Sequence, residues 1–332
     1  MNTSVISPYN SKINYPCSIG IEYAMVPRGV NPDIDITIEN KLKNVVKLID
    51  SHHSKSPLWK KLIYKSHKEG GKIERGAVEY SSKPLGNIDE VRKFYDYVNS
   101  MLEFGEKSSE LKFVANTTSK GVYIEGGGGH LHFNVSLPDK QKSIAFRRNI
   151  AIFMLNNPIV QWCMAEYCDD DILTSTYYNA LEREMRCKIS KFSSQLIEFH
   201  LENYSSGWGR APVQIRTVSH DEFKKALPTV EFRCLAAPTS FQHLVDNIDL
   251  CCAIWNYCLS LSSGNHLANL EFDNVAKIEE YYKEIENDPA KEWEYFIRSM
   301  NLDYKRYKKY LKNFQWRKEH GMFYSYEFAG LE

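Results

Sequence analysis

Two histidines and an asparagine alternate with apolar residues in the segment GHLHFNV, which ends a run of glycines. Alternate side chains of a β-strand share a face, so His130, His132 and Asn134 point the same way if this segment is a strand. Two imidazoles and an amide suit a metal ion, a phosphate or a polar substrate. The glycines at 126–129 let the backbone approach a ligand closely because they carry no Cβ. Taken alone, the pattern is more often a solvent-exposed strand face after a flexible turn.

A second segment, TVEFRCL, places Glu231 and Arg233 on one face of a strand. The two side chains need not neutralise each other if each has a different partner. A carboxylate can bind a divalent cation, and a guanidinium can grip a carboxylate or phosphoryl group with two donors. A surface ion pair is the alternative interpretation of this segment.

Two further acids interrupt apolar segments. Glu22 lies in GIEYAM and Glu79 lies in AVEYSSKP. A buried acid on such a strand needs partners, although a single strand acid is more often solvated. Four strands that each carry a carboxylate or an imidazole on the polar face favour one shared site over four unrelated surfaces.

Several other sites are excluded or weakened by the residues present. The glycine run lacks the GK[ST] of a P-loop, and no HExxH string of a zincin occurs. A cupin-like HxH site needs a later glutamate where Asn134, Ser136 and Asp139 follow, which leaves it a remote alternative. No Ser/His/Asp or Cys/His arrangement suggests a nucleophilic side chain.

Composition limits the partners. Lys+Arg and Asp+Glu both count 42, so no global field attracts nucleic acid or an anionic membrane. No window approaches the roughly 20 apolar residues that span a bilayer. The eight cysteines form no CxxC and most of them lie in apolar runs, and the first twenty residues lack the pattern of a signal peptide. We therefore expect a soluble cytoplasmic protein with reduced thiols.

Hydrophobic periodicity and turn residues predict the elements that must position these side chains. We expect strands at 18–26, 72–82, 121–137, 213–218 and 229–235, and helices at 38–51, 58–67, 89–104, 144–167, 177–204 and 241–261, with a helical tail from 272. Strands interleaved with helices predict an α+β fold with a mostly antiparallel sheet. Residues 1–265 would form the catalytic domain, and 266–332 a helical extension packed on it.

The ordered set GIE, VEYSSKP, GGGGHLHFNVSL and TVEFR resembles the amidoligase branch of the glutamine synthetase and glutamate–cysteine ligase superfamily. The resemblance runs from about residue 17 to about residue 250. It implies a curved, mostly antiparallel sheet flanked by helices, whose concave face holds two or three Mg²⁺ or Mn²⁺ ions between ATP and substrate. In such ligases ATP phosphorylates a carboxylate, and an amine then displaces the phosphate to give an amide.

Carried over residue by residue, the resemblance implies roles for three groups of residues. Metal ligands would be Glu22, Glu79, His130 and Glu231; ATP would lie near Gly128, Gly129, His132 and Asn134; and phosphate or acyl-phosphate would meet Arg233, with Arg210 or Arg216 as a loosely aligned second arginine. The family usually shows GxExE, and Ala24 replaces the second glutamate here. Either Glu74 or Glu125 supplies that ligand, or one metal site is weakened.

The sequence thus predicts an ATP- and metal-dependent carboxylate–amine ligase, with glutamate as the default acid by family habit. The amine can be a small molecule, a polyamine or a peptide terminus, and a homo-oligomer is compatible with this interpretation. A phosphotransferase on the same fold is one alternative, and a non-catalytic binding protein derived from a ligase is another, motivated by Ala24. The basic run YKRYKKYLKNF at 304–314 is interpreted as an amphipathic helix with its lysines on the solvated face, not as a nucleic-acid site.

Overall fold

The computed structural model describes residues 5–6, 14–15, 18–27, 36–64, 70–74, 77–114, 129–134, 150, 153, 157–164, 213–220, 223–232, 235, 237–261, 287–312 and 314–315. Within these residues the protein combines helices with an open antiparallel sheet, as the sequence predicted for the coarse fold class.

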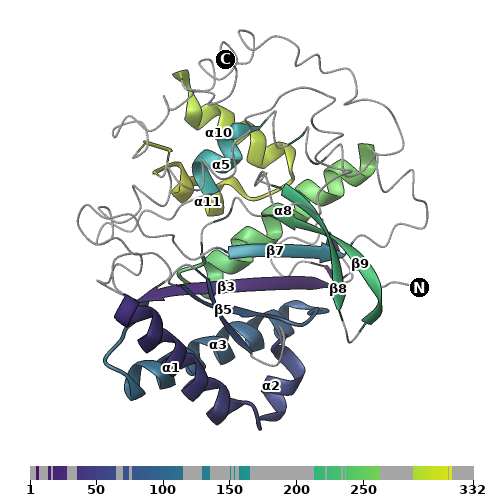
Figure 1. Cartoon of the computed structure of the whole chain (residues 1–332). Helices are drawn as coiled ribbons and strands as arrows, with labels where there is room; N and C mark the ends of the chain where they lie inside the picture. The colour runs from purple at the N-terminus through teal and green to yellow at the C-terminus, as the bar shows by residue number, and fades with distance from the viewer. Residues whose placement is uncertain are drawn as a thin grey trace, which may run out of the picture.

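The sheet has the strand order β4-β5-β3-β7-β9-β8, and every pairing is antiparallel. The strands are β4 (Gly71–Glu74), β5 (Ala77–Ser81), β3 (Ile19–Pro27), β7 (Gly129–Asn134), β9 (Phe223–Phe232) and β8 (Val213–His220), with β6 (Phe113–Val114) pairing the end of β3. A separate pair joins β1 (Val5–Ile6) to β2 (Asn14–Tyr15). The central strands are therefore β3 and β7, far apart in sequence but adjacent in space (Figure 1).

One face of this sheet is apolar and buried by helices. Its side chains, among them Ile21, Leu131 and Phe232, are at most 1% exposed. The covering helices include α3 (Ile88–Ser108) and α8 (Phe241–Leu261), whose Tyr95 and Trp255 rings lie 5.6 Å and 5.7 Å from those of Tyr23 and Phe133 respectively. Burial of this face fixes which residues occupy the opposite, polar face, because strand side chains alternate.

The helices on the N-terminal side pack closely onto each other. Helices α1 (Ile36–His53), α2 (Pro57–Leu62) and α3 gather beside the β4–β5–β3 end of the sheet (Figure 1). A Cβ on Gly105 of α3 would lie only 2.7 Å from the Ile49 side chain of α1, so glycine permits this approach. Helix α3 begins where Asn87 caps it by accepting from the Glu90 N–H, as the local sequence favours.

Three element boundaries differ from the sequence prediction. Helix α2 ends at Leu62, because Ile63 is extended and bridges to Ser82. The predicted strand at 72–82 is the hairpin β4–β5, and β9 begins at Phe223 because residues up to Pro228 pair with β8. The predicted helix at 177–204 and most of that at 144–167 lie outside the described residues; α5 (Pro158–Met164) is the part of the latter that can be described as an element.

The C-terminal elements α10 (Pro289–Ser299), α11 (Tyr304–Tyr307) and the 3₁₀ turn η2 (Lys308–Tyr310) follow, with α11 and η2 bound to α8. Tyr307, Leu311 and Phe314 are buried, as the helical spacing predicted. The bases are not all solvated, however. Arg306, to which the pattern assigned no position, pairs with Asp246 and Asp249 of α8.

Two further expectations can be compared with the described residues. The cysteines at 163, 251, 252 and 258 are buried, in keeping with their apolar surroundings in the sequence. Among the helices of the described residues, none combines the length and the hydropathy needed to cross a membrane.

Candidate metal centre

The register of three adjacent strands, β3, β7 and β9, brings acids and imidazoles together on the polar face. Glu22 of β3 lies directly opposite His130 of β7, and His132 of β7 lies directly opposite Glu231 of β9. Directly opposed residues of antiparallel strands share a face. Four side chains from three adjacent strands therefore occupy one small area of the sheet.

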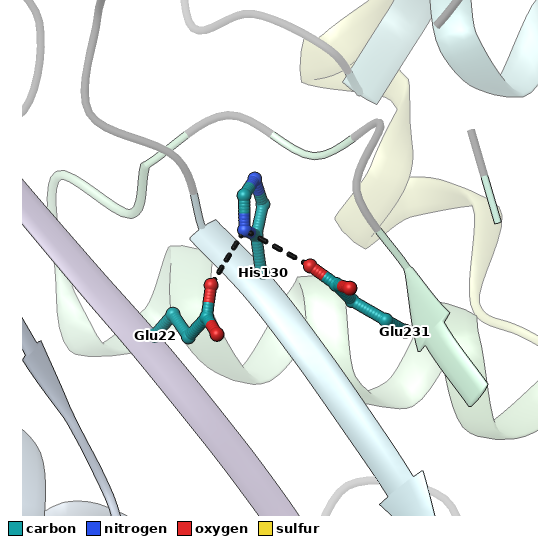
Figure 2. A group of neighbouring side chains, drawn as sticks. All are labelled: Glu22, His130 and Glu231. Carbon is teal, nitrogen blue, oxygen red and sulfur yellow. Dashed lines mark hydrogen bonds and ion pairs between the residues drawn. The ribbon is translucent and has the colours of Figure 1, made fainter. Parts of the chain in front are cut away.

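The atoms of three of these side chains converge (Figure 2). His130 Nδ1 lies 2.7 Å from Glu22 Oε2 and 3.3 Å from Glu231 Oε1. One ligand atom from each of Glu22, His130 and Glu231 can be chosen so that all three lie within 4.8 Å of one another. Two carboxylate oxygens and one imidazole nitrogen at this spacing could coordinate one divalent cation after small side-chain movements.

Exposure differs across the group. The Glu231 side chain is 0% exposed, whereas those of Glu22 and His130 are 21% and 15% exposed. Glu231 therefore forms the buried base of the group, and the other two side chains remain reachable. A carboxylate held in a buried position needs compensating positive charge or hydrogen-bond donors.

A second imidazole lies against Glu22. His132 Nε2 is 3.0 Å from Glu22 Oε1 and 3.9 Å from Glu231 Oε1. Each oxygen of Glu22 thus has its own histidine, because His130 contacts Oε2. Burial of Glu22 acts to raise its pKa, but the hydrogen bonds and charges of His130 and His132 outweigh it and hold that pKa well below its usual range. Glu22 is consequently ionised at neutral pH, the state that binds cations.

Glu79 lies on the same face but outside this group. It is on β5, directly opposite Ala24 of β3, in a different cross-strand row from Glu22, which faces Ser81. The Glu79 residue is buried, at 9% exposure. The cross-strand neighbour of Glu79 on β3 is therefore an alanine, at the position where the resemblance leads one to expect a second carboxylate, and its neighbour on β4 is Lys72.

The remaining predicted site residues are placed by backbone alone or lie outside the described residues. Asn134 and Arg216 both pair with Thr229 of β9, from its two sides, two residues along from the row that contains Glu231. Gly129 begins β7, and its N–H donates to the Leu235 carbonyl at 3.4 Å. Gly128, Arg210 and Arg233 lie outside the described residues.

Sequence reasoning missed the contribution of Gly20. This residue is the direct cross-strand partner of His132, and a Cβ added to it would lie 3.2 Å from His132 Cβ. The available signal was a glycine two residues before Glu22, on the same face. Its meaning depends on the pairing of β3 with β7, which local sequence does not show.

No protein-family model matches the chain, and no curated protein matches it. Among solved structures, the chain is similar to one in the "Crystal structure of the complex between Prokaryotic Ubiquitin-like Protein Pup and its Ligase PafA", with 12% sequence identity and a TM-score of 0.36. The match covers 74% of this chain and 47% of that chain, so this chain spans about half of its length. Similarity at this level decides neither fold nor activity.

Proposed function

We propose that the protein is an ATP- and divalent-metal-dependent ligase that joins a carboxylate to an amine. The observation that carries the proposal is the convergence of Glu22, His130 and Glu231 on the polar face of an antiparallel sheet. The sequence resemblance to the amidoligases supports it, since these three residues occupy the motif positions from which metal ligands are expected. A glutamine-synthetase-like curvature of the sheet belongs to the same proposal.

The donor set fits the metal that the proposal requires. Glu22, His130 and Glu231 would hold Mg²⁺ or Mn²⁺, and the imidazole makes Mn²⁺ the better match. When bound, such an ion supplies positive charge that offsets the negative charge of phosphate oxygens. Glu79, in a neighbouring row and opposite Lys72 of β4, would contribute to a second ion or to a metal-bound water.

The proposed reaction has two steps. An oxygen of the acid substrate attacks the γ-phosphorus of ATP, ADP leaves, and an acyl-phosphate forms. The amine nitrogen then attacks the acyl carbon, inorganic phosphate leaves, and the nitrogen loses a proton to solvent. No nucleophilic side chain is needed, so positioning and charge stabilisation are the contribution of the protein.

Other residues take roles in this proposal by their motif positions. Arg233 would contact the transferred phosphoryl group, assisted by Arg216 or Arg210, and ATP would lie along Gly128, Gly129 and Asn134. Small-molecule or peptide acids and amines are the substrates, with glutamate as the first acid to test. The division into a catalytic part, 1–265, and an extension, 266–332, is also retained as a proposal, and the bonds from Arg306 to α8 support the packing of the extension on the catalytic part.

A panel assay tests the function. The purified chain is incubated with ATP, Mg²⁺ or Mn²⁺, and pairs drawn from amino acids and amines, and products are identified by mass spectrometry. A ligase releases ADP and phosphate only when both substrates are present, and EDTA abolishes the amide product. A stable phosphorylated acid would indicate a kinase instead. Absence of Mg²⁺–ATP binding by calorimetry at millimolar concentration would indicate a binding protein and contradict the proposal.

Arg233 offers a sharper test of the mechanism. Arg233→Lys keeps the charge but loses the planar pair of donors, so kcat should fall on the order of 10²–10³-fold with the fold intact. Arg298→Lys, at an exposed side chain of α10, is the matched control and should leave kcat unchanged. Turnover near that of the wild type in Arg233→Lys would remove this arginine from the mechanism.

A further inference from the structure

The second histidine of the HxH pair lies where it can control the orientation of Glu22. Its direct cross-strand partner is Gly20, and Glu22 is two residues further along β3. The ring of His132 nevertheless brings Nε2 to 3.0 Å from Glu22 Oε1. It therefore reaches its diagonal neighbour on the same face, a distance that an aromatic side chain can span.

Gly20 makes room for this diagonal contact. A Cβ at that position would lie 3.2 Å from His132 Cβ, which is closer than most contacts of a Cβ, and at an ordinary 3.8 Å from its Cγ. The histidine would have to move by a few tenths of an ångström to admit it. The glycine thus allows the imidazole to lie across β3.

As a result of this contact, the two carboxylate oxygens of Glu22 have different partners. Oε1 faces His132, and Oε2 faces His130 in the three-residue group with Glu231. An ionised carboxylate only accepts hydrogen bonds, so His132 must donate from Nε2–H. His130 Nδ1 makes the same kind of contact with Oε2, and what separates the two histidines is their distance from Glu231 Oε1: 3.3 Å for His130 Nδ1 and 3.9 Å for His132 Nε2. The group whose ligand atoms lie within 4.8 Å contains Glu22, His130 and Glu231 and omits His132.

We propose that His132 is a positioning residue that holds Glu22 with Oε2 turned toward the cation. The inference rests on the proposed metal site and changes the role of His132, which the sequence resemblance would place near ATP. Residues that orient ligands commonly contribute about 10–100-fold to metal affinity. Here the oriented ligand is the carboxylate on the neighbouring strand.

Paired substitutions test the role by metal binding alone, without any substrate. His132→Gln keeps an N–H donor near the Nε2 position, and His132→Met has a similar length but no donor. The Kd for Mn²⁺ is measured from the free-ion signal in electron paramagnetic resonance, and circular dichroism checks that each variant is folded. We expect His132→Met to raise the Kd about 10–100-fold and His132→Gln to stay close to the wild type.

Other results would overturn the inference in distinguishable ways. A His132→Met protein with wild-type Mn²⁺ affinity would show that His132 does not position Glu22. Equal losses in the Gln and Met variants would show that the imidazole itself binds the ion. A wild-type chain that binds no Mn²⁺ would contradict the metal site of the proposed function, and this inference with it.

Discussion

Two groups of buried or partly buried carboxylates, one on the sheet and one on α8, differ in what faces them. On the polar face of the sheet, Glu22 and Glu231 face the imidazole of His130. On α8, Asp246 and Asp249, both 0% exposed, face the guanidinium of Arg306, whose Nη1 lies 2.6 Å from Asp249 Oδ2.

The cluster of Asp246, Asp249 and Arg306 on and against α8 consists of groups that stabilise a fold. Asp246 also accepts from Tyr310 Oη at 2.5 Å, from Lys309 Nζ at 2.8 Å and from Gln242 Nε2 at 2.9 Å. Burial acts to raise the pKa of Asp246, but Lys309, Tyr310, Arg306 and Gln242 outweigh it and lower that pKa. Arginine stays charged at all relevant pH values, so its positive charge balances the negative charge of these acids whenever the chain is folded.

The sheet cluster differs because an imidazole can be neutral and can itself bind a metal. A divalent cation could take the place of the proton between His130 and the two glutamates. The comparison teaches that burial of an acid does not reveal its purpose, whereas the kind of partner does. We therefore expect substitutions at α8 to change stability, and substitutions on the sheet to change metal affinity.

We expect the largest effect from Arg306→Met, which should lower the free energy of unfolding. This change leaves two fully buried carboxylates without their guanidinium, so the free energy of unfolding should fall by about 3–5 kcal/mol. Urea denaturation followed by circular dichroism measures it. Arg298→Met is the matched control, since its pair with Glu294 is exposed and should contribute less than about 1 kcal/mol. Equal losses in the two variants would refute the distinction between the buried and exposed pairs.

The next effect is a dependence of stability on pH, through His243 of α8. Burial lowers the pKa of His243 to about 4, with Asp246 opposing the shift and Lys309 adding to it. In the unfolded chain this histidine takes up a proton near pH 6.5, but in the folded chain only near pH 4. The contribution of neutral His243 to the free energy of unfolding is therefore complete above pH 6.5 and is lost as the pH falls from 6.5 to 4. The loss should be on the order of 3 kcal/mol.

His243→Asn isolates this contribution. The amide oxygen can accept from the Thr239 N–H, as His243 Nδ1 does at 3.3 Å, but it does not titrate. The slope of unfolding free energy against pH between 6.5 and 4 should therefore be smaller in the variant than in the wild type. Identical slopes in urea titrations would show that His243 is not the group responsible.

On the sheet, Glu231→Gln should raise the Kd for Mn²⁺, because it removes the charge of a ligand. The increase should exceed the factor of about 10–100 that is typical when a residue that only orients a ligand is replaced. Stability should change less than in Arg306→Met, since the substitution also removes a buried negative charge near Glu22. Calorimetric titration with Mn²⁺ and urea denaturation give the two quantities. Glu39→Gln, at an exposed acid of α1, is the control. A large loss of stability with unchanged affinity would reverse the comparison.

The smallest effect should come from Gly20→Ala. The added Cβ would displace His132 slightly, so Mn²⁺ affinity should fall by less than the about 10–100-fold expected for His132→Met. Gly86→Ala is the control, because a Cβ there would meet only Glu90 Oε2 at an ordinary 3.6 Å. An affinity unchanged in both variants would show that His132 has enough freedom to adapt.

Much of the sheet was predictable from its sequence, because alternation of apolar and polar residues identifies a face. The same rule placed Glu22, His130 and Glu231 on polar faces before any pairing was known. It could not show that His130 lies opposite Glu22 and that His132 lies opposite Glu231. Register depends on contacts between segments about 100 residues apart, which local sequence does not contain.

Arg306 shows the same limit for a helix. The spacing of Tyr307, Leu311 and Phe314 correctly identified a buried stripe and placed the lysines on the opposite face, but it predicted no partner for Arg306. The partners of Arg306 lie 57 and 60 residues earlier on α8. An amphipathic pattern identifies the apolar stripe of a helix but not the charges at its edge that find acids elsewhere.

The central claim is that Glu22, His130 and Glu231 form a metal centre, and anomalous diffraction from crystals grown with Mn²⁺ tests it most directly. We predict an anomalous peak within coordination distance of Glu22 Oε2, His130 Nδ1 and Glu231 Oε1, with His132 still donating to Glu22 Oε1. Crystals that show Mn²⁺ only at other acids, with His130 still hydrogen-bonded to Glu22, would contradict the account.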